Sequence, residues 1–375
     1  MSKFILKTDH RFSHFGDRNP EYAGSVVKAL ASSKYGVCDV LQVLYQQKNV
    51  KKSIKDLVSS MDAHVVSVDE LAPNIIEIVI HAPLASQNFE PGQFYKLQNY
   101  ETFSKKVNGV PLTIEPLAVT GASVDKDQGI VKVILLQNGV SSKLVSFLRP
   151  GEPVVLMGPT GAPTTIPDNC KKVLLIGGGL GNAVLFSIGQ KFKGSGVEVS
   201  YFAAYKNNTS IFKVDEIQKA AHHITWICEE KLDASWLLSD SLNQERFFQG
   251  NIIDALSYYK DELNQYDHMI VIGSDKMMEA VAKFRFYDFK QHFKSQSFAV
   301  ASINSPMQCM MQGICGQCVQ VQKDPKTGAE KVVFSCMNQD QNMEHVNFKC
   351  LHTRLSKNTV QEKINLAWSS SLLLE

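Results

Sequence analysis

Residues 173–181 read Val-Leu-Leu-Ile-Gly-Gly-Gly-Leu-Gly, and this stretch decides the fold. The four apolar residues have the pattern of a buried strand, and residues 182–193 continue with the spacing of a helix. A glycine turn between a strand and a helix places backbone N–H groups and a positive helix end around a pyrophosphate. The candidate nucleotide-binding glycines are Gly177, Gly178, Gly179 and Gly181. The alternative is a tight turn that only packs the helix on the strand.

The chain beyond this turn alternates between strand and helix patterns. The segments VEVSYFAAY, ITWICEE and HMIVIGS read as strands, and KVDEIQKAA and DKMMEAVAKFRF read as helices. Such alternation is typical of a doubly wound parallel sheet, so we predict a nucleotide-binding α/β domain over residues 168–297. The end of HMIVIGS forms a second strand-to-turn edge, which adds Gly273 to the candidate nucleotide-binding residues.

The chain before the turn has a different pattern of apolar residues. Residues 62–167 contain short alternating strands, among them HVVSVDEL, NIIEIVIHA, QFYKLQNY and IVKVILLQN, which predict a β-barrel. The segment PTGAPTTIPDN is rich in turn residues and marks the domain boundary. Residues 1–61 contain apolar residues at three- and four-residue spacing and are predicted to form a helical extension. The expected fold class is therefore multidomain, α/β plus β.

Four cysteines near the end of the chain form the strongest chemical signal. Cys309, Cys315, Cys318 and Cys336 have the spacing C-x5-C-x2-C-x17-C. Four thiolates suit a [2Fe–2S] cluster, because thiolates are the ligands that hold such clusters in proteins. A structural zinc site is the alternative for the same four ligands. We predict a small metal-binding domain over residues 298–375, ending in a helix with the sequence VQEKINLAWSSSLLL.

Length and composition limit the classes of protein that this chain can belong to. Its 375 residues suggest two or three domains, and its formal charge of +2 with scattered Lys and Arg gives no indication of a nucleic-acid partner. The sequence contains no uninterrupted apolar run long enough for a membrane span, and the stretch MSKFILKTDHRF does not resemble a secretion signal. We therefore expect a cytoplasmic protein.

Several motifs follow one another in an order that resembles the ferredoxin–NADP reductase superfamily. They are Pro91-Gly92-Gln93-Phe94, Pro111-Leu112-Thr113, Leu148-Arg149-Pro150-Gly151, Gly158-Pro159-Thr160-Gly161, the glycine turn and the four cysteines. Within the superfamily the chain is most similar to the electron-transfer subunit of dihydroorotate dehydrogenase. The loop SPMQCMMQGICGQC also resembles the C-terminal module of FAD-dependent oxidoreductases with a glutamate-synthase-small-subunit-like region. The resemblance covers residues 62 to about 345.

The resemblance implies an FAD-binding barrel, an NAD(P)-binding domain and a [2Fe–2S] domain. The family's flavin motif R-x-[YF]-[ST] corresponds to Val110-Pro111-Leu112-Thr113, so its arginine is absent. A second flavin segment, G-x-G-T in the family, corresponds to Gly139-Val140-Ser141-Ser142 and offers hydroxyls to phosphate. The family's C-G-P motif near the nicotinamide is replaced by Gly273-Ser274-Asp275. The implied flavin-binding residues are Pro111, Leu112, Thr113, Gly139, Ser141 and Ser142.

The function that follows is electron transfer between NAD(P)H, FAD and a [2Fe–2S] cluster, to or from a partner redox subunit or domain. Hydride transfer needs no amino-acid acid or base, so we assign no catalytic residue. The missing arginine and C-G-P motif keep a second hypothesis open: a non-catalytic interaction module with a structural zinc site. His222 and His223 have no spacing tied to a mechanism and are expected to be surface or core residues.

Overall fold

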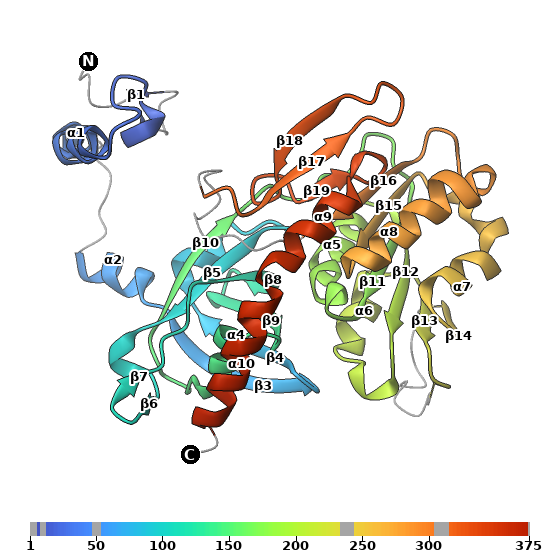
Figure 1. The fold of residues 1–375 in the computed structure, drawn as a ribbon, viewed down its shortest axis with the longest axis horizontal. Helices are drawn as coiled ribbons and strands as arrows, with labels where there is room; N and C mark the ends of the chain where they lie inside the picture. Colours follow the sequence, from blue (N-terminus) through green and yellow to red (C-terminus); the bar gives the residue numbers. More distant parts are fainter. Residues whose placement is uncertain (1–5, 8–12, 47–53, 233–243, 304–314, 374–375) are drawn as a thin grey trace. The chain divides into compact units, whose positions relative to one another are not determined.

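The computed structural model describes residues 6–7, 13–46, 54–232, 244–303 and 315–373 (Figure 1). It divides into two compact units, residues 1–59 and residues 60–375. The first unit contains a short antiparallel pair, β1 (Leu6–Lys7) and β2 (Ser13–His14), and the long helix α1 (Val26–Gln46). Helix α2 (Ile54–Met61) follows at the boundary between the units. Both helices lie in the stretch predicted to be helical, whereas the strand pair was not predicted.

The barrel of the second unit is a six-stranded antiparallel sheet with the strand order β10-β5-β8-β9-β4-β3. Its strands are β3 (His64–Ala72), β4 (Ile75–His81), β5 (Phe94–Asn99), β8 (Leu117–Asp125), β9 (Ile130–Leu136) and β10 (Val154–Thr160). The two edges close on each other, because Val65 N–H donates to Glu152 O and Val154 N–H donates to Ala63 O. Closure removes the exposed edges that an open antiparallel sheet would present.

One short hairpin and two short helices lie between the strands of the barrel along the chain. The hairpin of β6 (Lys106–Val107) and β7 (Val110–Pro111) leads into β8. Helix α3 (Pro83–Gln87) follows β4, and helix α4 (Val140–Leu144) follows β9.

The second sheet has seven strands in the order β14-β13-β12-β11-β15-β16-β19. Six of them are parallel: β11 (Lys172–Gly178), β12 (Glu198–Tyr205), β13 (His223–Cys228), β14 (Gln244–Gln249), β15 (His268–Ile272) and β16 (Phe298–Ser302). The order reverses direction between β11 and β15, which makes this pair the topological switch point where open α/β sheets bind ligands.

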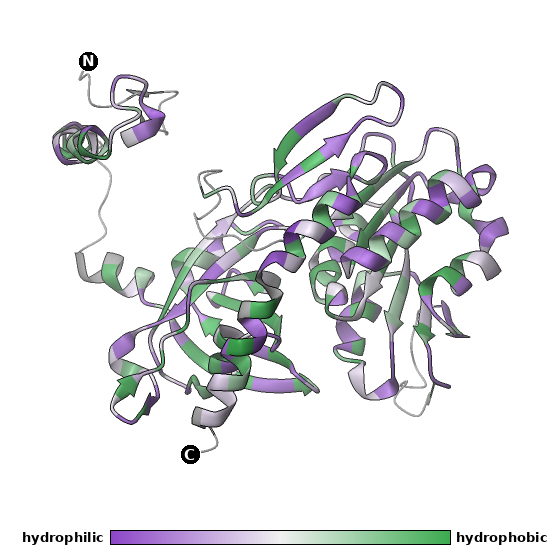
Figure 2. Ribbon diagram, viewed as in Figure 1, coloured by the Kyte–Doolittle hydropathy of each residue, from purple (hydrophilic) through white to green (hydrophobic). Residues whose placement is uncertain are grey.

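Helices cover both faces of this sheet. Helices α5 (Asn182–Gly194) and α6 (Val214–Ala220) bury one face, and α7 (Ile252–Tyr258) and α8 (Asp275–Lys283) bury the other. Figure 2 shows the apolar strands between these layers. Burial of apolar surface on both faces explains why the strands read as near-continuous hydrophobic runs in the sequence. Helix α5 also contacts β8, so it links the sheet to the barrel.

The cysteine-bearing segment is joined to the second sheet rather than separate from it. It contains the hairpin of β17 (Val319–Lys323) and β18 (Glu330–Phe334), strand β19 (Asp340–Asn342), and helices α9 (Phe348–Leu355) and α10 (Thr359–Leu373). Strand β19 pairs antiparallel with β16 and becomes the edge of the seven-stranded sheet. Within the described ranges, no helix is long and apolar enough to cross a membrane.

Candidate functional site

The glycine turn lies at the carboxyl end of β11, at the switch point. Gly179 adopts φ +54°, and a Cβ added to Gly181 would lie 2.2 Å from the carbonyl oxygen of Ile272 on β15. Only glycine allows the turn to approach the neighbouring strand so closely. The structure therefore brings the turn after β11 and the end of β15 together.

Gly273 lies on the same edge, and the side chain of Met277 fills the space between the two turns. A Cβ on Gly178 would meet the Met277 sulfur at 2.3 Å, and one on Gly273 would meet its terminal methyl at 2.6 Å. Met277 is held at the start of α8, where its N–H donates to Ser274 Oγ at 3.2 Å.

Asn182 fixes the shape of the glycine turn and was not among the residues assigned to the site from the sequence. Its Nδ2 donates to Gly179 O at 2.9 Å, and its Oδ1 accepts from the Tyr201 hydroxyl at 3.1 Å. The side chain is fully buried. A polar residue that opens an apolar helix directly after a glycine turn was the signal in the sequence.

The two candidate flavin segments lie next to each other on the barrel. The segment from Pro111 to Thr113 is held by Asn99, whose Oδ1 accepts from Ile114 N–H at 2.8 Å. Ser141, in the first turn of α4, accepts from Glu115 N–H at 3.1 Å. Leu112 is half-buried and Thr113 is exposed.

The hydroxyls that were expected to bind phosphate are partly engaged within the chain. The Ser142 hydroxyl donates to Gly139 O and accepts from Gly139 N–H, both at 2.9 Å, so it caps its own turn. The Ser141 oxygen accepts from the backbone, which leaves its proton to donate to a ligand. Of the two serines, Ser141 is therefore the better phosphate donor.

Two of the four predicted metal ligands form a buried pair. Cys318 and Cys336 are fully buried and pack with Phe94 of β5. The hairpin β17–β18 joins them, because both N–H and Oγ of Ser335 donate to Cys318 O at 3.2 Å. Apolar contact of two thiols without a disulfide is compatible with soft-metal ligands.

The other two predicted ligands are not part of this pair. Cys309 lies outside the described residues, and Cys315 is exposed at the start of the loop that leads to Cys318. In the part of the chain that the structure describes, no three His, Cys, Asp or Glu side chains converge to hold a metal ion. Of the four predicted ligands, the described residues thus bring only Cys318 and Cys336 together, and Cys315 lies three positions before Cys318 in the chain.

The buried cysteines lie close to the carboxyl ends of strands in the parallel sheet. Phe94 and Ala118 pack on the cysteine pair and also line a small cavity with Ile272 and Ser302, at the ends of β15 and β16. Barrel, parallel sheet and cysteine segment therefore meet in one region. A chain of short-range electron transfers needs this kind of proximity.

Asp340 holds this junction together. Its Oδ2 accepts from Thr164 Oγ1 at 2.6 Å, and Lys191 Nζ donates to Thr164 O at 2.8 Å. Burial raises the pKa of the Asp340 carboxyl, against the hydrogen bond from Thr164, which lowers it. A Cβ on Gly92 would lie 2.4 Å from Thr164 Oγ1, which explains the glycine of the Pro91–Phe94 motif.

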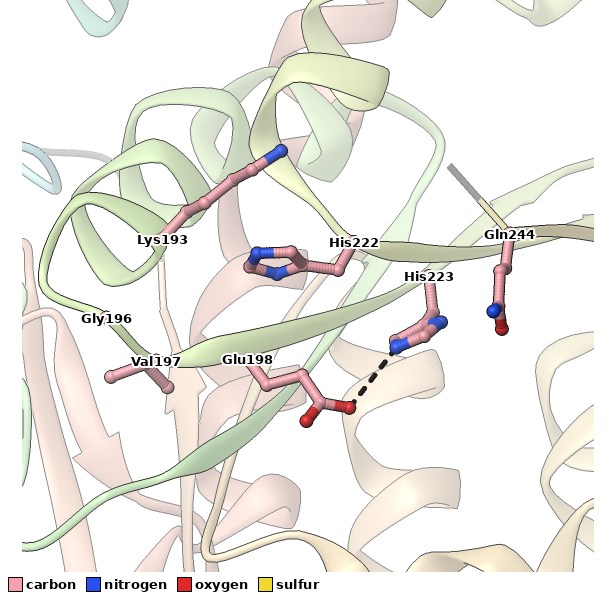
Figure 3. A pocket seen from close by; sticks show the side chains of 7 residues that line it. All are labelled: Lys193, Gly196, Val197, Glu198, His222, His223 and Gln244. Carbon is pink, nitrogen blue, oxygen red and sulfur yellow. Dashed lines mark hydrogen bonds and ion pairs between the residues drawn. The ribbon is translucent and has the colours of Figure 1, made fainter. Parts of the chain in front are cut away.

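A separate cavity lies at the amino ends of the strands of the parallel sheet. It has a volume of about 560 Å³ and is lined by Lys193, Gly196, Val197, Glu198, His222, His223 and Gln244 (Figure 3). These residues lie at the amino ends of the strands, whereas ligands of open α/β sheets bind at the carboxyl ends. This cavity is therefore not the candidate nucleotide site.

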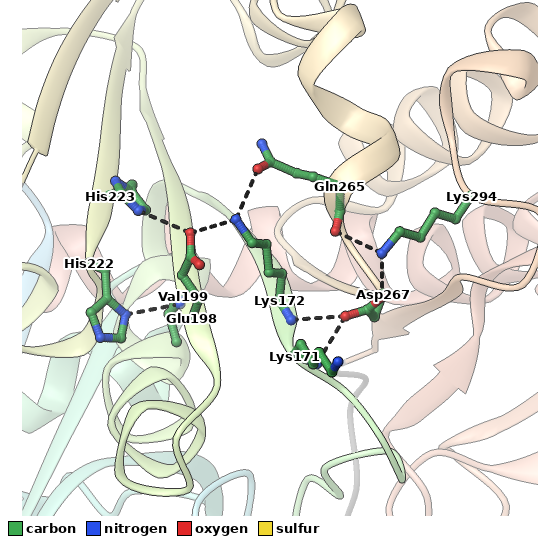
Figure 4. Close-up of polar contacts among 9 residues, drawn as sticks. All are labelled: Lys171, Lys172, Glu198, Val199, His222, His223, Gln265, Asp267 and Lys294. Carbon is green, nitrogen blue, oxygen red and sulfur yellow. Dashed lines mark hydrogen bonds and ion pairs between the residues drawn. The ribbon is translucent and has the colours of Figure 1, made fainter.

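The polar groups around this cavity bind one another (Figure 4). His222 Nδ1 accepts from Val199 N–H at 3.1 Å, and burial lowers the pKa of His222, so the ring stays neutral. His223 Nε2 and Lys172 Nζ both contact Glu198 Oε1, at 3.2 and 3.0 Å. Both histidine rings thus make polar contacts within the chain.

Comparison with known proteins gives relatives over most of the chain. No protein-family model matches. The chain is 31% identical over 360 residues to the uncharacterised protein RP006 of Rickettsia prowazekii, a match that covers 95% of this chain and 41% of that protein. The chain thus spans about two fifths of the length of that relative.

Two further matches cover nearly whole proteins. The chain is 24% identical over 306 residues to the dihydroorotate dehydrogenase B (NAD(+)) electron transfer subunit homolog of Thermotoga maritima, covering 80% of this chain and 93% of that protein. Among solved structures it matches an NADH-dependent reduced ferredoxin–NADP oxidoreductase with a TM-score of 0.65 and 22% identity. That match covers 81% of this chain and 96% of the solved one.

Proposed function

We propose that this chain, which resembles the ferredoxin–NADP reductase superfamily in sequence and shares its fold, is an electron-transfer module that uses NAD(P)H, FAD and a [2Fe–2S] cluster. The observation that carries the proposal is the packing of Cys318 and Cys336 on Phe94, next to the carboxyl ends of β15 and β16. When bound, the three groups together supply hydride transfer and its conversion to single-electron transfer.

The nucleotide is assigned to the carboxyl ends of β11 and β15. Backbone N–H groups of the turn Gly177–Gly181 would bind the pyrophosphate, Asn182 keeps the turn in shape, and the lack of a side chain at Gly273 leaves space for Met277 beside it. Gly273, Ser274 and Asp275 replace the family's C-G-P motif after β15, so this turn would bind the nicotinamide part of the nucleotide. These roles rest on the position of the residues at the switch point.

FAD is assigned to the barrel segments Pro111–Thr113 and Gly139–Ser142. Ser141 would donate its hydroxyl proton to a phosphate of FAD, and Leu112 would supply apolar contact from the loop that Asn99 holds. Val110 stands where the family has an arginine, so backbone donors and Ser141 replace a charge-assisted pair. We expect weaker FAD binding than in family members that carry the arginine.

The metal is assigned to Cys309, Cys315, Cys318 and Cys336. Electrons leave or enter the module through this metal site. A partner redox subunit or domain completes the reaction, as the subunit name of the Thermotoga relative suggests. RP006 has more than twice the length of this chain, which leaves room for such a domain in that relative.

A single preparation tests the proposal. The full chain is purified anaerobically, its visible spectrum is recorded, and iron, acid-labile sulfide, zinc and flavin are assayed. A yellow-brown protein with about two irons and two sulfides per chain, which bleaches when NADH or NADPH is added, is expected for a [2Fe–2S] flavoprotein. A colourless protein that holds zinc, and takes up no iron after reconstitution under reducing conditions, would overturn the proposal and establish the interaction module.

A further inference from the structure

Arg354 lies at the end of α9 and binds the loop between Cys315 and Cys318. Its Nη2 donates to Gly316 O at 2.8 Å and to Gln317 O at 3.1 Å. Gly316 adopts φ +69°, which glycine tolerates without strain, and its carbonyl also accepts from Val319 N–H at 3.3 Å. One guanidinium thus holds the two successive carbonyls that separate the two cysteines.

Helix α9 is a fixed support for this contact. Phe348 and Leu351 are buried in the core on one face of the parallel sheet. His352 contacts two carboxylates of α8, with Nδ1 on Asp275 and Nε2 on Glu279, the latter at 2.8 Å. Because α9 is anchored to α8, the hydrogen bonds of Arg354 fix the cysteine loop to the parallel-sheet domain.

Arginine suits this role better than lysine for two reasons. Its planar group presents two N–H bonds of one nitrogen in a fixed fork, whereas an ammonium is a flexible point charge. Its charge is permanent and half-buried, so water screens it less than a fully exposed charge.

We propose that Arg354 is a positioning residue of the metal site, which keeps the Cys315–Cys318 loop closed with Cys318 buried beside Cys336. The inference rests on the proposed function only in naming the metal that the loop holds. The closure of the loop is a property of the chain itself and is measurable without any metal.

The test uses the reactivity of Cys318 in the metal-free, reduced full chain. Cys318 is fully buried, so alkylation by iodoacetamide requires the loop to open, and peptide mass spectrometry separates Cys318 from the exposed Cys315. Arg354→Gln should increase the alkylation rate of Cys318 by at least about ten-fold, because it removes the charged donor of both hydrogen bonds to the loop. Arg354→Lys, which keeps the charge without the fork, should give a smaller increase.

Two controls separate loop opening from charge and from misfolding. Lys349→Gln removes a positive charge from the exposed face of the same helix and should leave the Cys318 rate unchanged. Cys315 serves as an internal reference, because its rate responds to charge but needs no opening. A circular dichroism spectrum that matches the wild type shows that each variant folds.

Metal binding gives the second measurement. After reconstitution with iron and sulfide, Arg354→Gln should lose iron to a chelator faster than the wild type and Lys349→Gln, and its centre should have a lower reduction potential, with Arg354→Lys restoring the potential. Equal Cys318 rates in the wild type and Arg354→Gln would overturn the positioning role, whatever the iron content. If the wild type binds no iron but Arg354→Gln still exposes Cys318, the proposed function fails and the positioning role stands.

Discussion

Lys213 Nζ lies 2.7 Å from Glu77 Oε2. Lys213 directly precedes helix α6 of the parallel-sheet domain and Glu77 lies in strand β4, so this ion pair joins that domain to the barrel. The Glu77 side chain is 8% exposed and that of Lys213 25% exposed, so removing the ammonium leaves a carboxylate without its charge partner in a poorly solvated position. Lys213→Met should destabilise the chain by about 2 kcal/mol, somewhat less than for a fully buried pair. Urea denaturation measures this change.

The double variant Lys213→Met with Glu77→Gln provides the control for this pair. Removing both charges avoids the unpaired carboxylate, so the double variant should recover part of the lost stability. A single Lys213→Met variant as stable as the wild type would show that the contact contributes nothing. Lys213 has φ +51°, and methionine keeps its Cβ, so backbone strain is equal in both proteins.

Gly178→Ala and Gly181→Ala should differ although both glycines belong to the same turn. The new Cβ at position 178 meets the flexible end of Met277, whereas the one at position 181 meets the backbone of Ile272 at 2.2 Å. Gly181→Ala should therefore lose about 2–3 kcal/mol of stability through overpacking, and Gly178→Ala less than 1 kcal/mol. Urea denaturation gives both values, and Met277→Ala should relieve the Gly178→Ala variant but not the other. Equal losses would contradict the close approach of the turn to β15.

His352 should make the stability of the chain dependent on pH. Its hydrogen bonds to Glu279 and to Asp275 raise the pKa of His352 above its ordinary value. The folded state therefore binds the proton more tightly, so this contribution is complete below pH 6.5 and is lost as the pH rises through the folded-state pKa. The effect should be about 0.5 kcal/mol, as for other solvent-accessible pairs.

Thermal unfolding of the wild type and of His352→Asn between pH 5 and 9 measures this contribution. The two proteins should differ most at the acidic end of this range and least at the alkaline end. A difference that grows with rising pH would contradict the assignment.

The cysteines should separate into two groups by their effect on metal content. Cys318→Ser and Cys336→Ser should each reduce bound iron to near background, because a serine hydroxyl is a harder and less acidic ligand than a thiol. Cys350→Ser is the matched control, since Cys350 lies on α9 and is not among the four predicted ligands. Iron and zinc assays on anaerobically purified variants measure the outcome. Unchanged metal in both Cys318→Ser and Cys336→Ser would place the metal elsewhere.

Local patterns predicted the individual elements well. The alternating segment Ile130–Leu136 forms β9, and the glycine turn ends β11 as expected, because short-range periodicity reports burial on one or two faces. The predicted resemblance to the ferredoxin–NADP reductase superfamily is confirmed by the relatives and by the shared fold. The assignment of flavin, nucleotide and metal residues stays a prediction.

Long-range relationships could not be predicted from the sequence. Strand β14, Gln244–Gln249, has few apolar residues because it lies at a sheet edge, so it carries no periodic signal. Arg354 and Gly316 lie 38 positions apart, and the role of Asn182 depends on Tyr201 of another strand. Spacing along the chain contains no information about such pairs, since tertiary packing brings them together.

Strand β19 joins the thiol-bearing segment to the parallel sheet through its pairing with β16. Its pairing with β16 means that Ser302 and Asp340 share a hydrogen-bonded ladder, so the segment cannot detach without baring the amides of β16 to solvent. Deuterium uptake along Phe298–Ser302 should therefore report on the integrity of a region that begins more than a dozen residues further along the chain. Oxidation of the buried thiols should then increase exchange at this strand pair and around Phe94 of the barrel, which packs on both cysteines.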